Sequence, residues 1–220
     1  MFETATQTSK EVRSKTRWKI LSVLLSYPDH PAFEGLLADA LDVSLNALDV
    51  DMAKSVNNLR HLPLPELAKV YVNAFDMNEK TSLYLTAHEL GESRERGAAL
   101  VKLHMILRVM GYEIETGELP DYLPALFELF AEADDDEMLH ELKYRVGIVC
   151  KAIEGRLEDE HPYRSLFTLA ALSLPSESQR TARFDESSTV QQSQPTLTAP
   201  CALSADHDDA LPMPYPLVYD

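Results

Sequence analysis

Apolar residues recur at intervals of three and four positions in one segment after another between residues 18 and 174. The clearest series is Leu139, Leu142, Val146, Val149 and Ile153. This spacing places side chains on one face of an α-helix, whereas a half-buried strand requires strict alternation. Residues 80–90, KTSLYLTAHEL, include enough β-branched and aromatic residues for a strand, but no partner strand is apparent, so we expect a helix there. The sequence predicts an all-α, single-domain bundle of about eight to nine helices.

Short polar residues ahead of apolar stripes predict where several helices begin. Ser44 is placed to cap a helix starting at Leu45, and Ser93 is placed to cap the helix that ends before Gly111. Asp121 precedes a helix that has a proline in its first turn, a position that proline tolerates. We therefore expect Ser44, Ser93 and Asp121 to act as caps.

Gly97 falls on the apolar side of its predicted helix, together with Leu100, Leu103 and Leu107. A glycine there permits close contact with another helix. It is equally consistent with a tolerated helix glycine that costs about 1 kcal/mol of helix stability.

The composition changes after Pro175. Residues 175–220 are rich in proline, serine, threonine and acidic residues and have no periodic apolar face. Such a composition is typical of disorder. We therefore predict a helical domain at 1–174 and a disordered tail at 175–220. The final run, LPMPYPLVY, is either a docking segment for another protein or a solvated end.

The charge balance limits the kinds of partner. The chain has 20 basic and 36 acidic residues and a formal net charge of −16, which opposes nucleic acid and anionic lipid and favours cationic partners. Eleven acidic residues and no Lys or Arg lie between Gly111 and Leu142. This acidic run is either a solvated face or the rim of an apolar groove that accepts a basic amphipathic helix.

Several classes of protein are disfavoured. The chain has no GxxxxGK[ST] or GxGxxG phosphate-binding loop and no GxSxG elbow. Cys150 lies on a buried helical face and Cys201 in the tail, which gives no disulfide framework and fits a reducing cytoplasm. The apolar run from Ile20 to Leu25 is too short for an export signal or a membrane span. We read it as part of a first amphipathic helix.

One pair of residues has the spacing of metal ligands. His88 and Glu92 lie one helical turn apart, as two metal ligands can, but the second histidine of an HExxH motif is missing. A helical metal-dependent enzyme that uses His88 and Glu92 is the alternative from another functional class.

Four runs of the sequence are familiar as a set: YVNAFD, SLYLTAHELGESRERGAALVKL, GELPDYLPALFEL and HPYRSLF. Over about residues 21–174 the chain resembles the delta-subunit family of respiratory nitrate reductase assembly chaperones (NarJ-type). That family belongs to the TorD-like redox-enzyme maturation chaperones. GESRERG and ELPDYLP stand in the family's order and spacing.

The resemblance implies an all-helical cytoplasmic protein with no catalytic activity and no cofactor of its own. It implies binding to the N-terminal peptide of the molybdenum-containing catalytic subunit of respiratory nitrate reductase. The family holds that subunit until the molybdenum cofactor is inserted and the complex docks on its membrane anchor, and is not part of the finished enzyme. Neither nucleic acid binding nor membrane insertion is implied, and a different molybdoenzyme is an alternative partner.

The resemblance also suggests which residues line the peptide groove. The candidates lie in the first three runs: Tyr71, Phe75, Asp76, Tyr84, His88, Arg94, Arg96, Gly97, Asp121, Tyr122 and Leu123. Arg94 and Arg96 have a second reading, as internal ion-pair partners of the acidic loop.

Overall fold

The computed structural model describes residues 2–28, 32–114, 117–133 and 137–175, with side chains from residue 11 onwards. The all-α prediction is confirmed, because these ranges contain nine α-helices and no β-strand. The helices are α1 (Phe2–Leu24), α2 (Phe33–Asn46), α3 (Val50–Arg60), α4 (Leu64–Tyr71), α5 (Leu85–Leu90), α6 (Glu95–Val109), α7 (Leu123–Glu132), α8 (Glu137–Glu154) and α9 (Arg164–Ser173). The predicted disordered tail lies outside the described residues, apart from Pro175.

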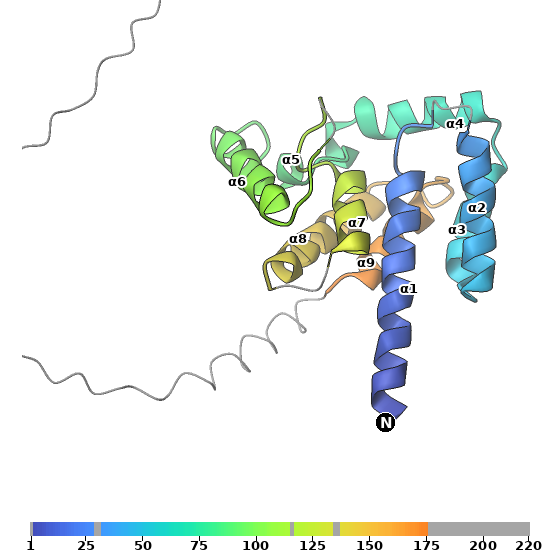
Figure 1. Cartoon of the computed structure of the whole chain (residues 1–220). Coiled ribbons are helices and arrows are strands. Elements are labelled where there is room, and N and C mark those ends of the chain that lie inside the picture. Colours follow the sequence, from blue (N-terminus) through green and yellow to red (C-terminus); the bar gives the residue numbers. More distant parts are fainter. Residues whose placement is uncertain (1, 29–31, 115–116, 134–136, 176–220) are drawn as a thin grey trace, which may run out of the picture.

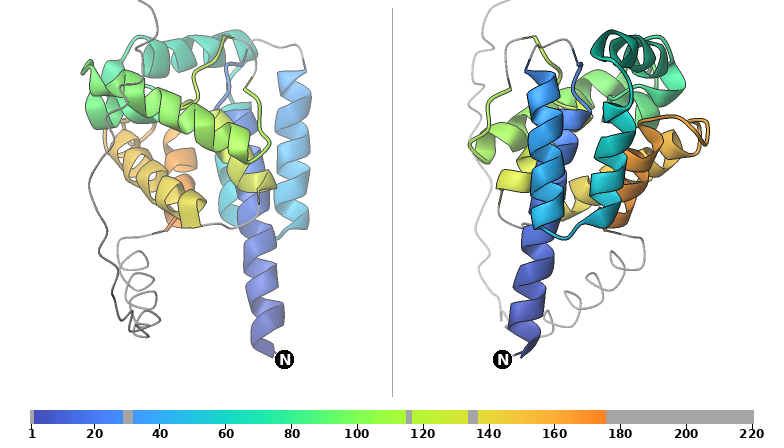
Figure 2. Two further views of the ribbon diagram at one scale, coloured as in Figure 1. Left: turned by 60° about the vertical axis from the view of Figure 1, so that its left-hand side comes forward. Right: turned by 90° about the vertical axis from the view of Figure 1, so that its right-hand side faces the viewer.

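Helix α1 runs through the middle of the bundle (Figure 1). It packs along α7 on one side, against α2 on the other, and also against α9, and α2 pairs with α3. Helices α8 and α9 pair with each other, and α5 and α6 lie at the edge farthest from α2 (Figure 1). The N-terminal part of α1 extends beyond the bundle in both views of Figure 2.

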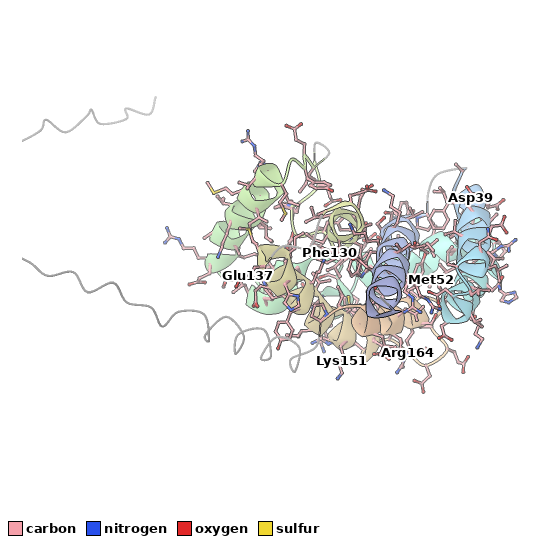
Figure 3. All side chains as sticks on the ribbon, turned by 60° about the horizontal axis from the view of Figure 1, so that its bottom comes forward. Asp39, Met52, Phe130, Glu137, Lys151 and Arg164 are labelled. Carbon is pink, nitrogen blue, oxygen red and sulfur yellow. The ribbon has the colours of Figure 1, made fainter. Side chains whose placement is uncertain are left out.

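The core forms where the apolar stripes of these helices meet. Met52 and Phe130 lie on the two sides of α1 (Figure 3), and both are fully buried. The ring of Trp18 meets Phe130 edge-on, with centroids 5.9 Å apart. The ammonium group of Lys143 lies 4.7 Å from the Trp18 ring centroid, a cation–π distance. Among the helices in the described ranges, none is long and apolar enough to cross a membrane.

The predicted cap at Ser44 is wrong. Helix α2 continues past it to Asn46, and the buried Ser44 hydroxyl donates to the carbonyl of Ala40 at 2.6 Å. Asp49 caps α3 instead, with a carboxylate oxygen that accepts from the Met52 N–H at 3.3 Å. The cause is tertiary, because the guanidinium of Arg17 from α1 also holds this carboxylate, with Nη2 and Oδ1 2.8 Å apart.

The other two caps also differ from the prediction. The residue before α6 is Arg94, not Ser93, and the residue before α7 is Tyr122, not Asp121; neither caps its helix through its side chain. Segment 80–90 is helical only in part, because α5 begins at Leu85.

Of the two interpretations of Gly97, the structure supports a tolerated helix glycine. It is exposed, and a Cβ atom at this position would meet nothing within 4 Å. It is therefore a tolerated helix glycine and not a point of close helix contact.

Candidate functional site

Two of the runs quoted above meet through backbone hydrogen bonds. Tyr84 and Tyr122 form an isolated antiparallel bridge. The N–H of Leu85 donates to the carbonyl of Asp121 at 2.9 Å, and the N–H of Leu123 donates to the carbonyl of Leu83 at 2.8 Å. The bridge fixes the start of α5 beside the start of α7.

The carboxylate of Asp121 strengthens the same junction. It is fully buried, and its Oδ2 accepts from the Thr86 N–H at 3.0 Å and from the Thr86 hydroxyl. Arg96 Nε donates to that hydroxyl oxygen at 3.2 Å. Asp121 thus caps the first turn of α5, across the fold, and not its own helix. Arg96 therefore reaches the neighbourhood of Asp121, where the alternative prediction expected an ion pair. Its hydrogen-bond acceptor, however, is the Thr86 hydroxyl group and not a carboxylate.

A cluster of tyrosines lies next to this junction. The Tyr71 hydroxyl donates to the carbonyl of Leu25 at 3.0 Å and lies 3.1 Å from the Tyr122 hydroxyl. The Tyr84 hydroxyl donates to Glu118 at 3.1 Å, and its ring lies 5.5 Å from that of Tyr122. Burial, with the nearby Glu118 carboxylate, raises the pKa of Tyr84 to about 12. Burial also raises the pKa of Tyr71 and Tyr122. All three are therefore neutral hydrogen-bonding groups at physiological pH.

The outer side of Tyr122 opens into a groove of about 640 Å³ between α1, α7 and the loop that follows α6. Its floor is mainly apolar and includes Val23, Leu107, Tyr112, Ile114, Tyr122, Pro124, Ala125 and Leu129. Its rim carries four carboxylates: Glu113, Glu118, Glu128 and Glu132. We call this hollow the acidic groove. Apolar floor and anionic rim together match the needs of an amphipathic basic segment.

One cation already sits on this rim. The Lys19 ammonium from α1 lies 2.8 Å from Glu128 Oε1 and 3.2 Å from Glu132 Oε1. The hydrogen bond to Glu128 is the main cause that raises the pKa of Lys19. All three side chains are about half exposed, so the pairs contribute little to stability. The two glutamates, one helical turn apart on α7, thus hold one basic side chain between them.

A second hollow of about 510 Å³ lies between the end of α3 and the loop before α9. Its lining is largely polar and includes His61, His161 and Arg164. Arg164 is paired with Asp159 at 2.5 Å, and burial lowers the pKa of His161. Because it lacks a continuous apolar floor, this hollow is less suited to an amphipathic segment than the acidic groove.

The residues predicted from the family runs fall into three groups. Four are buried in the core: Tyr71, Phe75, Asp121 and Leu123. Four are partly buried: Tyr84, His88, Arg96 and Tyr122. Three are exposed: Asp76, Arg94 and Gly97. Only Tyr122 lines the acidic groove, although Tyr84 and Tyr71 support it from behind. Direct peptide contact stays a prediction for all of them.

His88 and Glu92 do not form a metal centre with a third ligand. His88 Nε2 lies 2.8 Å from the carbonyl of Ser82, its Nδ1 lies 3.3 Å from Arg156, and burial lowers its pKa. Glu92 points to solvent and approaches Arg96 at 3.9 Å. In the described part of the chain no cluster of three or more His, Cys, Asp or Glu residues could hold a metal ion.

Sequence reasoning missed most of the groove's residues. Glu128 and Glu132 stand four apart on α7, and Leu129 sits between them, so the α7 pattern alone could have suggested a mixed acidic and apolar edge. Val23 and Lys19 gave no such signal, since they come from α1 and reach the site only through packing.

The sequence has clear relatives. A family described as nitrate reductase delta subunit matches residues 35–161. The chain is 34% identical over 166 residues to NarW of Escherichia coli (strain K12), described as a probable nitrate reductase molybdenum cofactor assembly chaperone; the match covers 73% of this chain and 70% of that protein. It is 34% identical over 157 residues to NarJ of the same strain, described as a nitrate reductase molybdenum cofactor assembly chaperone, with 68% and 66% covered.

A solved structure supports the fold. A protein of Archaeoglobus fulgidus, described as a redox enzyme maturation protein, superposes with a TM-score of 0.57 at 18% sequence identity. The superposition covers 72% of this chain and 91% of that one. The family match spans more than half of the sequence, and the helical architecture agrees with it. The chain belongs to the nitrate reductase delta subunit family.

Proposed function

We propose that this protein is an assembly chaperone for nitrate reductase, and that it binds the N-terminal segment of the molybdenum-containing catalytic subunit in the acidic groove. It acts in the cytoplasm and holds that subunit ready for insertion of the molybdenum cofactor. The complex docks on its membrane anchor only afterwards, and the chaperone leaves. It has no catalytic activity of its own.

The observation that carries the proposal is the combination of floor and rim in one groove. Apolar side chains such as Val23, Tyr112 and Leu129 can bury one face of a helical segment. The carboxylates of Glu128 and Glu132 can meet Lys or Arg on its flank. Family membership supplies the class of partner, since NarJ and NarW are described as chaperones of nitrate reductase.

Calorimetric titration of the full chain with the N-terminal peptide of the catalytic subunit from the same organism tests this. We expect one-to-one binding that weakens as salt is added, because exposed charge attraction is screened over about 8 Å at physiological ionic strength. Neutralising the rim with Glu128→Gln and Glu132→Gln removes two exposed contacts. At about 0.5 kcal/mol each, this weakens binding about fivefold.

A matched control carries the same change in net charge elsewhere. Glu34 on α2 and Glu66 on α4 are exposed, and Glu66 pairs with Lys69 at 2.9 Å much as Glu128 pairs with Lys19. The Glu34→Gln, Glu66→Gln variant should bind as the unaltered protein does. Equal weakening in both variants would point to net charge and not to the groove. No binding at any salt concentration would remove this peptide as the ligand, and leader peptides of other molybdoenzymes would be titrated next.

A further inference from the structure

Helix α6 is apolar on two opposite sides. Leu103 and Leu107 face the bundle and are buried. On the opposite side Val101, Met105 and Val109 follow one another at intervals of four and are 58%, 62% and 82% exposed. Neighbouring exposed apolar side chains often mark a contact site. The described part of the chain leaves this second stripe uncovered.

The exposed stripe is also basic. Lys102 and Arg108 flank it and are exposed, and the sequence from Arg96 to Tyr112 contains no Asp or Glu. We call Val101, Lys102, Met105, Arg108 and Val109 the outer face of α6. In the left view of Figure 2, α6 lies in front of the other helices at the surface of the bundle. A basic, apolar face is unusual on a chain whose net charge is −16.

The same chain contains a segment whose sequence is complementary to this face. Residues 206–220, DHDDALPMPYPLVYD, begin with three aspartates among their first four residues, continue with a run of apolar and aromatic residues, and end in a fourth aspartate. The aspartates match Lys102 and Arg108 in charge, and the following side chains match the apolar stripe. Prolines stand at every second position from Pro212 to Pro216, a pattern that disfavours an α-helix. Residues 176–205 connect it to the bundle and can span up to about 100 Å, which reaches any face.

We propose that the C-terminal segment 206–220 docks on the outer face of α6 of its own chain. The acidic residues Asp206, Asp208 and Asp209 meet the two cations, and the residues from Leu211 onwards cover Val101, Met105 and Val109. This contact does not depend on the proposed function. The docking surface and the acidic groove use opposite sides of α6, because Leu107 lines the groove.

The test uses the full chain with a single spin label inside the docking segment, at position 210 between its acidic and its apolar parts. Cys201→Ser together with Ala210→Cys places the label there. Cys150 is fully buried and burial raises the pKa of its thiol, so it escapes labelling. We expect the amide resonances of α6 to lose most of their intensity relative to the reduced label, while those of α2 keep theirs.

Two pairs of substitutions separate a specific contact from chance proximity. Val101→Ser with Met105→Ser should restore the α6 intensities, and both positions are exposed, so the fold tolerates them. The control, Leu36→Ser with Val43→Ser, changes exposed residues of α2 and should leave the loss in place. Full α6 intensities in the labelled protein would overturn the proposal, as would a loss that survives Val101→Ser with Met105→Ser.

One mixed sample tests whether the segment binds its own chain or a second copy. Isotope-labelled chain without the spin label is combined with spin-labelled chain without isotopes. We expect no loss of intensity, because the segment binds its own chain. A loss of α6 signals in this sample would assign the segment to a second copy and overturn the intramolecular contact.

Discussion

The hydroxyl oxygens of Tyr71 and Tyr122 lie 3.1 Å apart and join two runs that are 51 positions apart in the sequence. Tyr122 lines the acidic groove, whereas Tyr71 is buried behind it and also donates to the carbonyl of Leu25 in the segment after α1. The wall of the groove is therefore held by a hydrogen-bond chain that starts in the core.

We predict that Tyr71→Phe destabilises the fold. The change removes the donor to the Leu25 carbonyl and a partner of Tyr122, and a buried hydrogen bond of this kind contributes about 1 kcal/mol. Denaturant unfolding followed by circular dichroism measures the loss. Tyr27→Phe is the control, because the Tyr27 ring packs edge-on against Tyr71 but is 42% exposed. Equal losses in the two variants would contradict the role of the Tyr71 hydroxyl.

Lys19→Met tests whether Glu128 and Glu132 bind a basic side chain of the peptide. The native ammonium neutralises Glu128 and Glu132, so its removal leaves both carboxylates free for a basic side chain of the peptide. We expect the peptide to bind about two- to fivefold more tightly, the range of an exposed ion pair, with stability changed by less than about 1 kcal/mol. Calorimetric titration and denaturant unfolding measure the two effects. Weaker binding would show that Lys19 itself serves the peptide.

Asp49→Asn tests the ion pair that holds α1 on the cap of α3. The hydrogen bond from Arg17 is the main cause that lowers the pKa of Asp49, and the carboxyl is nearly fully buried. A lowered folded-state pKa stabilises the fold above the unfolded-state value of about 3.9, and this contribution is lost as the pH falls through the folded-state pKa. We expect a cost of about 2 kcal/mol at pH 7 that shrinks below about pH 4.

The measurement is the free energy of unfolding of both proteins between pH 7 and pH 3. Asp51→Asn is the matched control, since Asp51 is exposed and lies 4.0 Å from Lys54. Its effect should stay below about 0.5 kcal/mol. If the cost of Asp49→Asn were the same at every pH, the negative charge of Asp49 would not be its cause, and the prediction would be wrong.

Gly97→Ala should stabilise the protein. Nothing lies within 4 Å of the Cβ that alanine would add. Alanine is up to about 1 kcal/mol better than glycine inside a helix, and Gly97 lies in the first turn of α6, so we expect a gain below that value. Gly147→Ala is the comparison, because its Cβ would meet the Leu174 Cβ at 3.3 Å in a buried position. Thermal unfolding should rank Gly97→Ala above the unaltered protein and Gly147→Ala below Gly97→Ala. The reverse order would mean that Gly97 has a contact in solution that its exposure hides.

The sequence predicted the type of the candidate site but not most of its residues. The acidic run between Gly111 and Leu142 raised the idea of an acidic rim beside apolar faces, and such a groove lies beside α7. The sequence did not show which carboxylates form the rim. Glu128 and Glu132 become neighbours of Lys19 only through packing, across 109 and 113 positions of the chain. Family motif residues such as Tyr71 and Asp121 proved to be buried supports of the groove wall.

The helical architecture follows from the sequence alone, because an apolar spacing of three and four needs only the local geometry of a helix to create a buried face. How the polar groups near the helix ends are used depends on the packing of the helices. Ser44 could cap a helix but lies inside one, and Asp121 serves α5 and not its own helix. Such choices depend on which donor arrives from elsewhere in the chain, here Arg17 for Asp49 and Thr86 for Asp121, and that is fixed only when the helices pack.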